Sequence, residues 1–135
     1  MTLLLRYLGY LCIISAFFRV IPIITAIYYA EDFTLFVVSF FLSIILGAFL
    51  VIMSSRSGRV PSSITLKNGF MLAALSFIVL PLIGAISFLP SFSYNILDAF
   101  FESVSGFTTT GLTLYETLDE LPKSLLMWRA ETQWM

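Results

Sequence analysis

The sequence predicts an all-α integral membrane protein. Its 135 residues are 59% hydrophobic and 11% charged, whereas soluble domains carry roughly 25% charged residues. The mean hydropathy is +1.00. Three apolar windows, residues 7–30, 34–53 and 69–89, each reach the roughly 20 residues that a helix needs to cross about 30 Å of hydrocarbon. The composition therefore argues against a water-soluble fold and predicts a lipid bilayer as the surroundings.

Composition also argues against several functional classes. The chain contains no histidine, and its one cysteine, Cys12, lies inside the first apolar window without neighbours for a disulfide or a metal cluster. The net charge of −1 and the lack of a strong basic run argue against nucleic acid as a partner. No catalytic constellation and no phosphate-cradling loop can be identified. We expect neither an enzyme nor a bound cofactor.

Charges between the windows predict the orientation. Basic residues lie before the first window and in the Ser/Gly/Pro-rich loop at residues 54–68, namely Arg6, Arg56, Arg59 and Lys67. Acidic Glu31 and Asp32 follow the first window instead. Since basic loops favour the cytoplasmic side, the N-terminus and the 54–68 loop are expected to be cytoplasmic, and Glu31 and Asp32 external. The third window then emerges outside the cell.

A short helix is predicted after the third window, at residues 96–107. Apolar side chains recur there at helical spacing, but the segment is too short to span. Asn95 is a suitable N-cap, and Asp98 at the third helical position complements the positive end of the helix dipole. A threonine-rich loop follows, and another apolar segment begins near Leu121 and stops at Met135.

This order of segments is typical of a re-entrant pore loop. Irregular backbone at membrane depth is tolerated only where it is buried in protein or lines a water-filled path. We therefore expect residues 1–68 to form two leading transmembrane helices and a cytoplasmic loop. Residues 69–135 are expected to form a helix–pore loop–helix unit whose last helix is truncated.

The loop carries a Thr-x-Gly core at Thr109-Thr110-Gly111. Potassium filters replace the water shell of the ion with backbone carbonyls, and glycine adopts the backbone dihedrals that this requires. The carbonyls of Thr109, Thr110, Gly111 and Leu112 are predicted to face K⁺, with the hydroxyl of Thr108 or Thr109 at the inner end. A threonine run alone is weak evidence, and its position after a short helix between two apolar segments supports the interpretation.

Several residues around the loop are candidates for support. Glu102 lies among apolar residues of the short helix, and it either adds negative potential behind the filter or binds backbone amides or a basic group. Arg129 and Gln133, four residues apart, are expected to brace the loop. Glu116, Asp119 and Glu120 follow the loop; they either concentrate cations at the mouth or form a solvated turn.

Two residues in the spans raise separate expectations. Arg19 lies near the middle of the first window, where a charge costs at least roughly 2.5–3.5 kcal/mol. It should therefore have a partner, with Asp98 and Glu102 as candidates, unless it reaches water. Trp128 is expected to anchor its helix at the membrane interface, as tryptophan often does.

The stretch DAFFESVSGFTTTG at residues 98–111, followed by LMWR at 126–129 and TQW at 132–134, resembles the first pore-loop region of the Trk/Ktr/HKT potassium transporter superfamily, most closely its TrkH branch. The resemblance implies four such units around one pore, a homodimer, a cytoplasmic nucleotide-binding regulatory subunit (TrkA-like) and the cell inner membrane. It also places Gly111 at the filter glycine, where serine would suggest sodium.

The expected function is thus monovalent cation transport, with K⁺ as the transported ion and this chain as the N-terminal quarter of a TrkH-like subunit. The loop leaves open whether movement is channel-like or coupled to another ion, as in a symporter. Two alternatives remain at this point: a small membrane interaction protein without a pore, and a self-assembling channel subunit with one loop per chain.

Overall fold

The computed structural model describes residues 2–56 and 65–135, so the centre of the predicted 54–68 loop, including Arg59, lies outside the described residues. Every regular element in the described ranges is helical, which confirms the predicted all-α class. The elements are α1 (Thr2–Phe18), α2 (Val20–Tyr28), α3 (Thr34–Ser55), α4 (Leu66–Ala85), the 3₁₀-helix η1 (Ile86–Phe92), α5 (Ile96–Phe107) and α6 (Lys123–Thr132).

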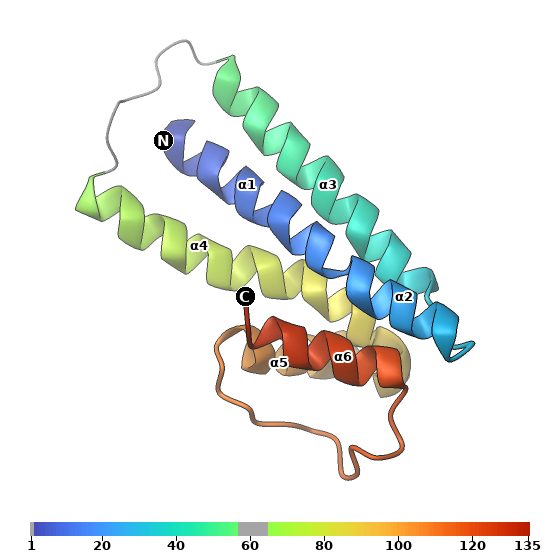
Figure 1. Ribbon diagram of the computed structural model, residues 1–135. Helices are drawn as coiled ribbons and strands as arrows, with labels where there is room; N and C mark the ends of the chain where they lie inside the picture. Colours follow the sequence, from blue (N-terminus) through green and yellow to red (C-terminus); the bar gives the residue numbers. More distant parts are fainter. Residues whose placement is uncertain (1, 57–64) are drawn as a thin grey trace.

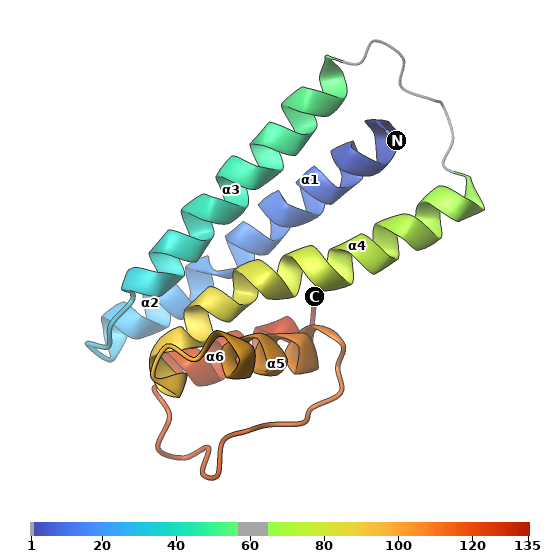
Figure 2. The ribbon, with the colours of Figure 1, turned by 180° about the vertical axis from the view of Figure 1, so that it is seen from behind.

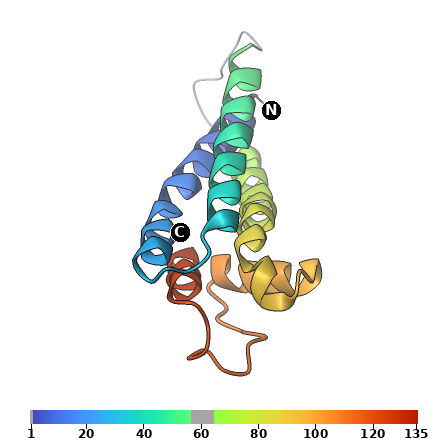
Figure 3. The same ribbon diagram turned by 90° about the vertical axis from the view of Figure 1, so that its right-hand side faces the viewer.

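Three helical segments in the described ranges are long and apolar enough to cross a membrane: Leu3–Tyr28, Thr34–Ser55 and Leu66–Phe92. They coincide with the three predicted windows. Figure 1 shows α1, α3 and α4 as long rods packed side by side, with α5 and α6 below them. Viewed from the side, α5 and α6 lie together at one end of the long helices (Figure 3).

The first span is interrupted at Arg19, between α1 and α2. Pro22 has no backbone N–H to donate to the carbonyl of Phe18, and its ring crowds that carbonyl. At the break, the Arg19 amide donates to the carbonyl of Ala16 at 3.0 Å. This bond reaches back three residues, so the turn is tighter than in an α-helix. The break directs α2 against α6.

Two glycines bring α1 and α3 close together. A Cβ added to Gly9 would lie 2.7 Å from the carbonyl oxygen of Gly47, and the reverse distance is also 2.7 Å. Because apolar helices in lipid gain little from the hydrophobic effect, this close backbone approach is a main source of their attraction. The two leading spans therefore form a tightly packed hairpin.

A turn in left-handed conformation separates η1 from α5. Ser93 and Tyr94 have φ of 51° and 64°, and they reverse the chain toward the short helix. From behind, α5 lies beside α6 (Figure 2). The core between these elements consists of Phe36, Ala85, Phe88, Ala99, Phe107, Leu125 and Trp128. Residues 108–122 connect the end of α5 to the start of α6 on the side away from the long helices.

Candidate functional site

The start of α5 agrees with its predicted cap. The Asn95 side-chain oxygen accepts from the amide of Leu97 at 3.1 Å, and its amide nitrogen donates to Asp98 at 2.6 Å. Asp98 therefore complements the positive end of the helix dipole. It lies at the opposite end of α5 from the threonine-rich loop, so its contribution is to helix stability.

We call residues 108–114 the candidate filter loop. Thr109 and Gly111 adopt left-handed backbone conformations, with φ of 56° and 75°. The amides of Thr109 and Thr110 donate back to the carbonyls of Gly106 and Ser105, at 2.9 and 3.1 Å. The chain therefore leaves α5 through a tight hydrogen-bonded turn, and a non-glycine residue at position 111 would be strained.

The carbonyls of the loop differ in whether they accept a hydrogen bond from the described residues. The Leu112 carbonyl accepts from the Ser105 hydroxyl at 2.5 Å, and the Gly111 carbonyl accepts from Arg129 at 3.4 Å. No hydrogen bond from the part of the chain that the structure describes reaches the carbonyls of Thr109 or Thr110. Because the loop is exposed along its length, these two carbonyls are available to an ion.

The threonine hydroxyls at the inner end of the loop are linked to each other. The Thr108 hydroxyl donates to the carbonyl of Val104 at 2.7 Å, and it lies 2.8 Å from the hydroxyl of Thr110. Thr108 is thereby fixed to the last turn of α5, whose negative dipole end points in the same direction.

Glu102 and Arg129 form an ion pair behind the loop, and we call it the Glu102–Arg129 clamp. Glu102 is 1% exposed. Its carboxylate also accepts from the amide of Leu114 at 3.1 Å and from the Thr113 hydroxyl at 3.1 Å. Arg129 donates to the Thr113 hydroxyl at 2.8 Å and to the Gly111 carbonyl. The clamp therefore joins α5, the loop and α6.

Two small residues set how closely α5 approaches its neighbours. A Cβ on Gly106 would overlap the Thr132 hydroxyl of α6. On the other side, the Ser103 hydroxyl donates to the carbonyl of Pro81 at 2.8 Å. This bond joins α5 to the part of α4 that contains its proline.

Glu31 forms a long-range cap at the start of α6. Its carboxylate accepts from the amide of Lys123 at 2.7 Å, the amide of Ser124 at 2.9 Å and the Ser124 hydroxyl at 2.6 Å. Burial raises the pKa of Glu31, but the hydrogen bonds outweigh burial and hold the pKa below its ordinary value. Sequence reasoning missed this contact because nothing local connects residues 92 positions apart.

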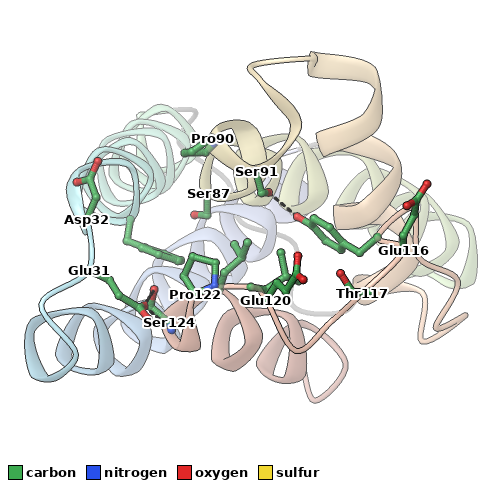
Figure 4. A pocket seen from close by; sticks show the side chains of 14 residues that line it. Glu31, Asp32, Ser87, Pro90, Ser91, Glu116, Thr117, Glu120, Pro122 and Ser124 are labelled. Atoms are coloured by element: carbon green, nitrogen blue, oxygen red, sulfur yellow. Dashed lines mark hydrogen bonds between the residues drawn. The ribbon is translucent and has the colours of Figure 1, made fainter.

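A cavity of about 460 Å³ opens beside this cap. Figure 4 shows Glu31 and Asp32 on one side of it and Glu116 and Glu120 on the other. Tyr115 lines another wall, and its hydroxyl forms a hydrogen bond of 2.5 Å with the Ser91 hydroxyl. Burial raises the pKa of Tyr115 to about 12. In the described ranges, no group of three or more His, Cys, Asp or Glu side chains could hold a metal ion. The cavity is acidic without being a metal centre of that kind.

The two predicted brace residues differ in their surroundings. Arg129 is part of the clamp. Gln133 follows the last turn of α6 and is exposed, and it is not a member of the clamp. Asp119 is also exposed and does not line the acidic cavity, whereas Glu116 and Glu120 do.

The expected partners of Arg19 were wrong. Glu102 is paired with Arg129, and Asp98 is hydrogen-bonded to Asn95. The guanidinium of Arg19 is fully buried, lies 4.5 Å from the centre of the Trp128 ring and donates to the carbonyl of Ser15 at 2.8 Å. The expected interfacial position of Trp128 was also wrong. Its ring is buried in the core, where it packs between Arg19 and Phe107.

Comparison with known proteins shows the family of the chain. Residues 33–135 match the model of the TrkH family, described as cation transport proteins. The chain belongs to the TrkH family. The matched region includes α5, the candidate filter loop and α6, and so contains every residue of the clamp.

Relatives of this TrkH-family chain come from bacteria and archaea. The Trk system potassium uptake protein TrkH of Escherichia coli is 36% identical over 133 residues, which cover 96% of this chain and 27% of that protein. An uncharacterized cation transporter of Methanocaldococcus jannaschii is 34% identical over 135 residues, covering 98% of this chain and 27% of the relative. The chain therefore spans about a quarter of the length of these relatives.

Proposed function

We propose that this chain is the first pore-forming quarter of a TrkH-like potassium transport subunit. The observation that carries the proposal is the pair of carbonyls at Thr109 and Thr110, which accept no hydrogen bond from the described residues and lie at the end of a short helix whose negative pole points toward them. The family membership and the potassium uptake described for the Escherichia coli relative support the choice of a cation as substrate.

The transported ion is K⁺ under this proposal. The carbonyls of Thr109 and Thr110 provide the ligands, and the hydroxyl of Thr108 lies at the inner end of the loop. The carbonyls of Gly111 and Leu112, which the sequence also predicted to face the ion, accept hydrogen bonds from Arg129 and Ser105. The clamp holds Gly111 and Leu114 from behind, because Arg129 and Glu102 bond to the backbone at these two positions. Glu116 and Glu120 at the outer cavity raise the local concentration of cations.

The proposal also covers the assembly of the transporter. The remaining three quarters of the pore belong to the rest of a TrkH-like subunit, which forms a homodimer and binds a cytoplasmic, nucleotide-binding TrkA-like regulatory subunit. The three apolar helices lie in the cell inner membrane with the N-terminus in the cytoplasm. The proposed partners are thus other protein chains and the lipid bilayer, without nucleic acid.

A chimera tests the proposal. Residues 1–135 replace the matching segment of Escherichia coli TrkH, and a smaller graft replaces only the segment matching residues 96–132. Both are expressed in Escherichia coli cells that lack their own potassium uptake systems. We expect growth on low-potassium medium and potassium uptake from both.

If both grafts reach the membrane in the amount of the parent and neither takes up potassium, the proposal is wrong. The chain alone, reconstituted in lipid vesicles, tests the self-assembling alternative. We expect no potassium flux from it, because one loop provides only one side of a filter. A selective flux from the chain alone would favour a self-assembling channel instead.

A further inference from the structure

Three buried side chains of α1–α2 and α6 have polar atoms without partners. Arg19 and Trp128 are 0% exposed, and Glu131 is 7% exposed. In the described part of the chain, Nε and Nη2 of Arg19, Nε1 of Trp128 and both carboxylate oxygens of Glu131 have no hydrogen-bond partner. Buried polar groups are nearly always satisfied, so this cluster of donors and acceptors requires an explanation.

Glu131 lies three residues after Trp128 on α6, so the two buried side chains lie on the same face of the helix, and Trp128 contacts Arg19. Arg19 and Glu131 carry opposite charges and come from different parts of the fold: Arg19 from the break between α1 and α2, and Glu131 from the last turn of α6. A cavity of about 330 Å³ beside Glu131 is lined by Phe18, Ile21, Met127, Ala130, Glu131 and Trp134. Glu131 is the only charged residue among these, and Phe18 directly precedes Arg19 in the chain.

Trp128 connects this charge pair to the clamp. Its ring stacks under the guanidinium of Arg19 at 4.5 Å. It directly precedes Arg129, which bonds to Glu102, Thr113 and Gly111. A rotation or shift of α6 that moves Trp128 away from Arg19 would therefore also displace the guanidinium of Arg129, which contacts the loop.

We propose that Arg19 and Glu131, packed with Trp128, form a buried charge pair bridged by water that fixes α6 to the break in the first span and so positions the Arg129 end of the clamp. Arg19 is then a positioning residue for the loop. The part of this proposal that concerns the loop rests on the proposed function, whereas the charge pair itself does not.

The charge pair is tested on the 135-residue chain in lipid nanodiscs. A Trp134→Phe background leaves Trp128 as the sole tryptophan, because the chain contains two. Arg19→Met and Glu131→Gln each leave one buried charge uncompensated. We expect each to increase acrylamide quenching of Trp128 and to lower the melting temperature by on the order of 10 °C.

The double variant Arg19→Met with Glu131→Gln removes both charges. It should recover most of the melting temperature and most of the protection of Trp128 from acrylamide quenching. Arg19→Lys keeps the charge without the flat guanidinium and should fall between. If Glu131→Gln has no effect, or if the double variant is as poorly folded as the single ones, the charge pair is refuted. Arg56→Met, at an exposed arginine, is the matched control and should change neither readout.

The positioning role is tested in the potassium-transporting chimera. Arg19→Met should lower the preference for K⁺ over Na⁺ at equal membrane abundance, and the double variant should restore part of it. An unchanged preference would refute positioning while the quenching data decide the charge pair separately. If the parent chimera does not transport at all, the positioning role falls with the proposed function, and the charge pair still stands or falls on the nanodisc measurements.

Discussion

Among single residues, Glu102 connects the candidate filter loop to α6. Its carboxylate binds the Leu114 amide, the Thr113 hydroxyl and the guanidinium of Arg129. A buried carboxylate of this kind is tolerable only because every contact is with a donor. The residue therefore serves as the joint between helix, loop and α6.

Glu102 and Arg129 should be energetically coupled. Glu102→Gln keeps the shape but leaves Arg129 without a counter-charge, and we expect a loss of about 3–5 kcal/mol in the free energy of unfolding. Arg129→Met leaves Glu102 buried and unpaired, with a similar loss. The double variant should be more stable than the sum of the two losses by roughly 1–3 kcal/mol. Denaturant unfolding followed by circular dichroism measures all three, and strictly additive losses would refute the coupling.

Predictions for single residues from the sequence succeeded where the interaction is local. Asn95 and Asp98 lie within one turn of each other, so their cap was predictable from spacing. The sequence left open whether Glu102 acts through its potential or through direct bonds, and the structure shows direct bonds. The partner of Arg19 could not be predicted, because it depends on how α6 packs against α2.

At the scale of helices, the position of the loop depends on how α5 and α6 are held together. Gly106 lets α5 touch Thr132, and the Glu31 carboxylate holds the first turn of α6 from the opposite end. α6 is therefore fixed at its start by the turn between α2 and α3 and along its side by α5.

Gly106→Ala should separate α5 from α6. The new methyl group would overlap the Thr132 hydroxyl, so one helix must move. We expect a loss of about 1–3 kcal/mol in the free energy of unfolding. Thr132→Ala in the same chain should recover only part of the loss, because the Cβ of residue 132 is itself 3.0 Å from the added atom. Full recovery, or no loss in the single variant, would contradict the packing described; thermal unfolding distinguishes these results.

The Glu31 cap should make stability depend on pH. The pKa of Glu31 is lowered from its ordinary 4.5, so the ionised carboxylate stabilises the fold above that pH, and the contribution is lost as the pH falls through the lowered pKa. Glu31→Gln should therefore melt at a lower temperature than the parent at pH 6, and the difference should shrink at pH values below 4.5. A difference that is constant over this range would show that charge at Glu31 is not involved.

At the scale of the whole chain, the sequence predicted the architecture well. Length and apolarity decide where helices cross a membrane, so the three spans and the short helix at Ile96–Phe107 followed from composition and periodicity. The packing could not be predicted in the same way. The burial of Trp128 and the cap formed by Glu31 depend on contacts between residues distant in sequence, and single-sequence periodicity carries no information about them.

The orientation of the chain is testable with single cysteines in a Cys12→Ser background. Asp32→Cys and Ser55→Cys are both at exposed positions at opposite ends of α3. With a membrane-impermeant thiol reagent on intact cells, Asp32→Cys should react and Ser55→Cys should not, since the positive-inside rule places residues 54–68 in the cytoplasm. After the cells are opened, both should react. The opposite pattern would invert the topology.

The most direct test of the central claim is the ratio of K⁺ to Na⁺ uptake in the chimera with and without Gly111→Ser. Gly111 has a φ of 75°, and apart from its two chain neighbours no atom of the described residues lies within 4 Å of an added Cβ. The substitution therefore acts on the backbone of the loop without a steric clash. We predict a lower preference for K⁺ at unchanged membrane abundance. An unchanged ratio in a variant that still transports would show that this loop does not select the ion.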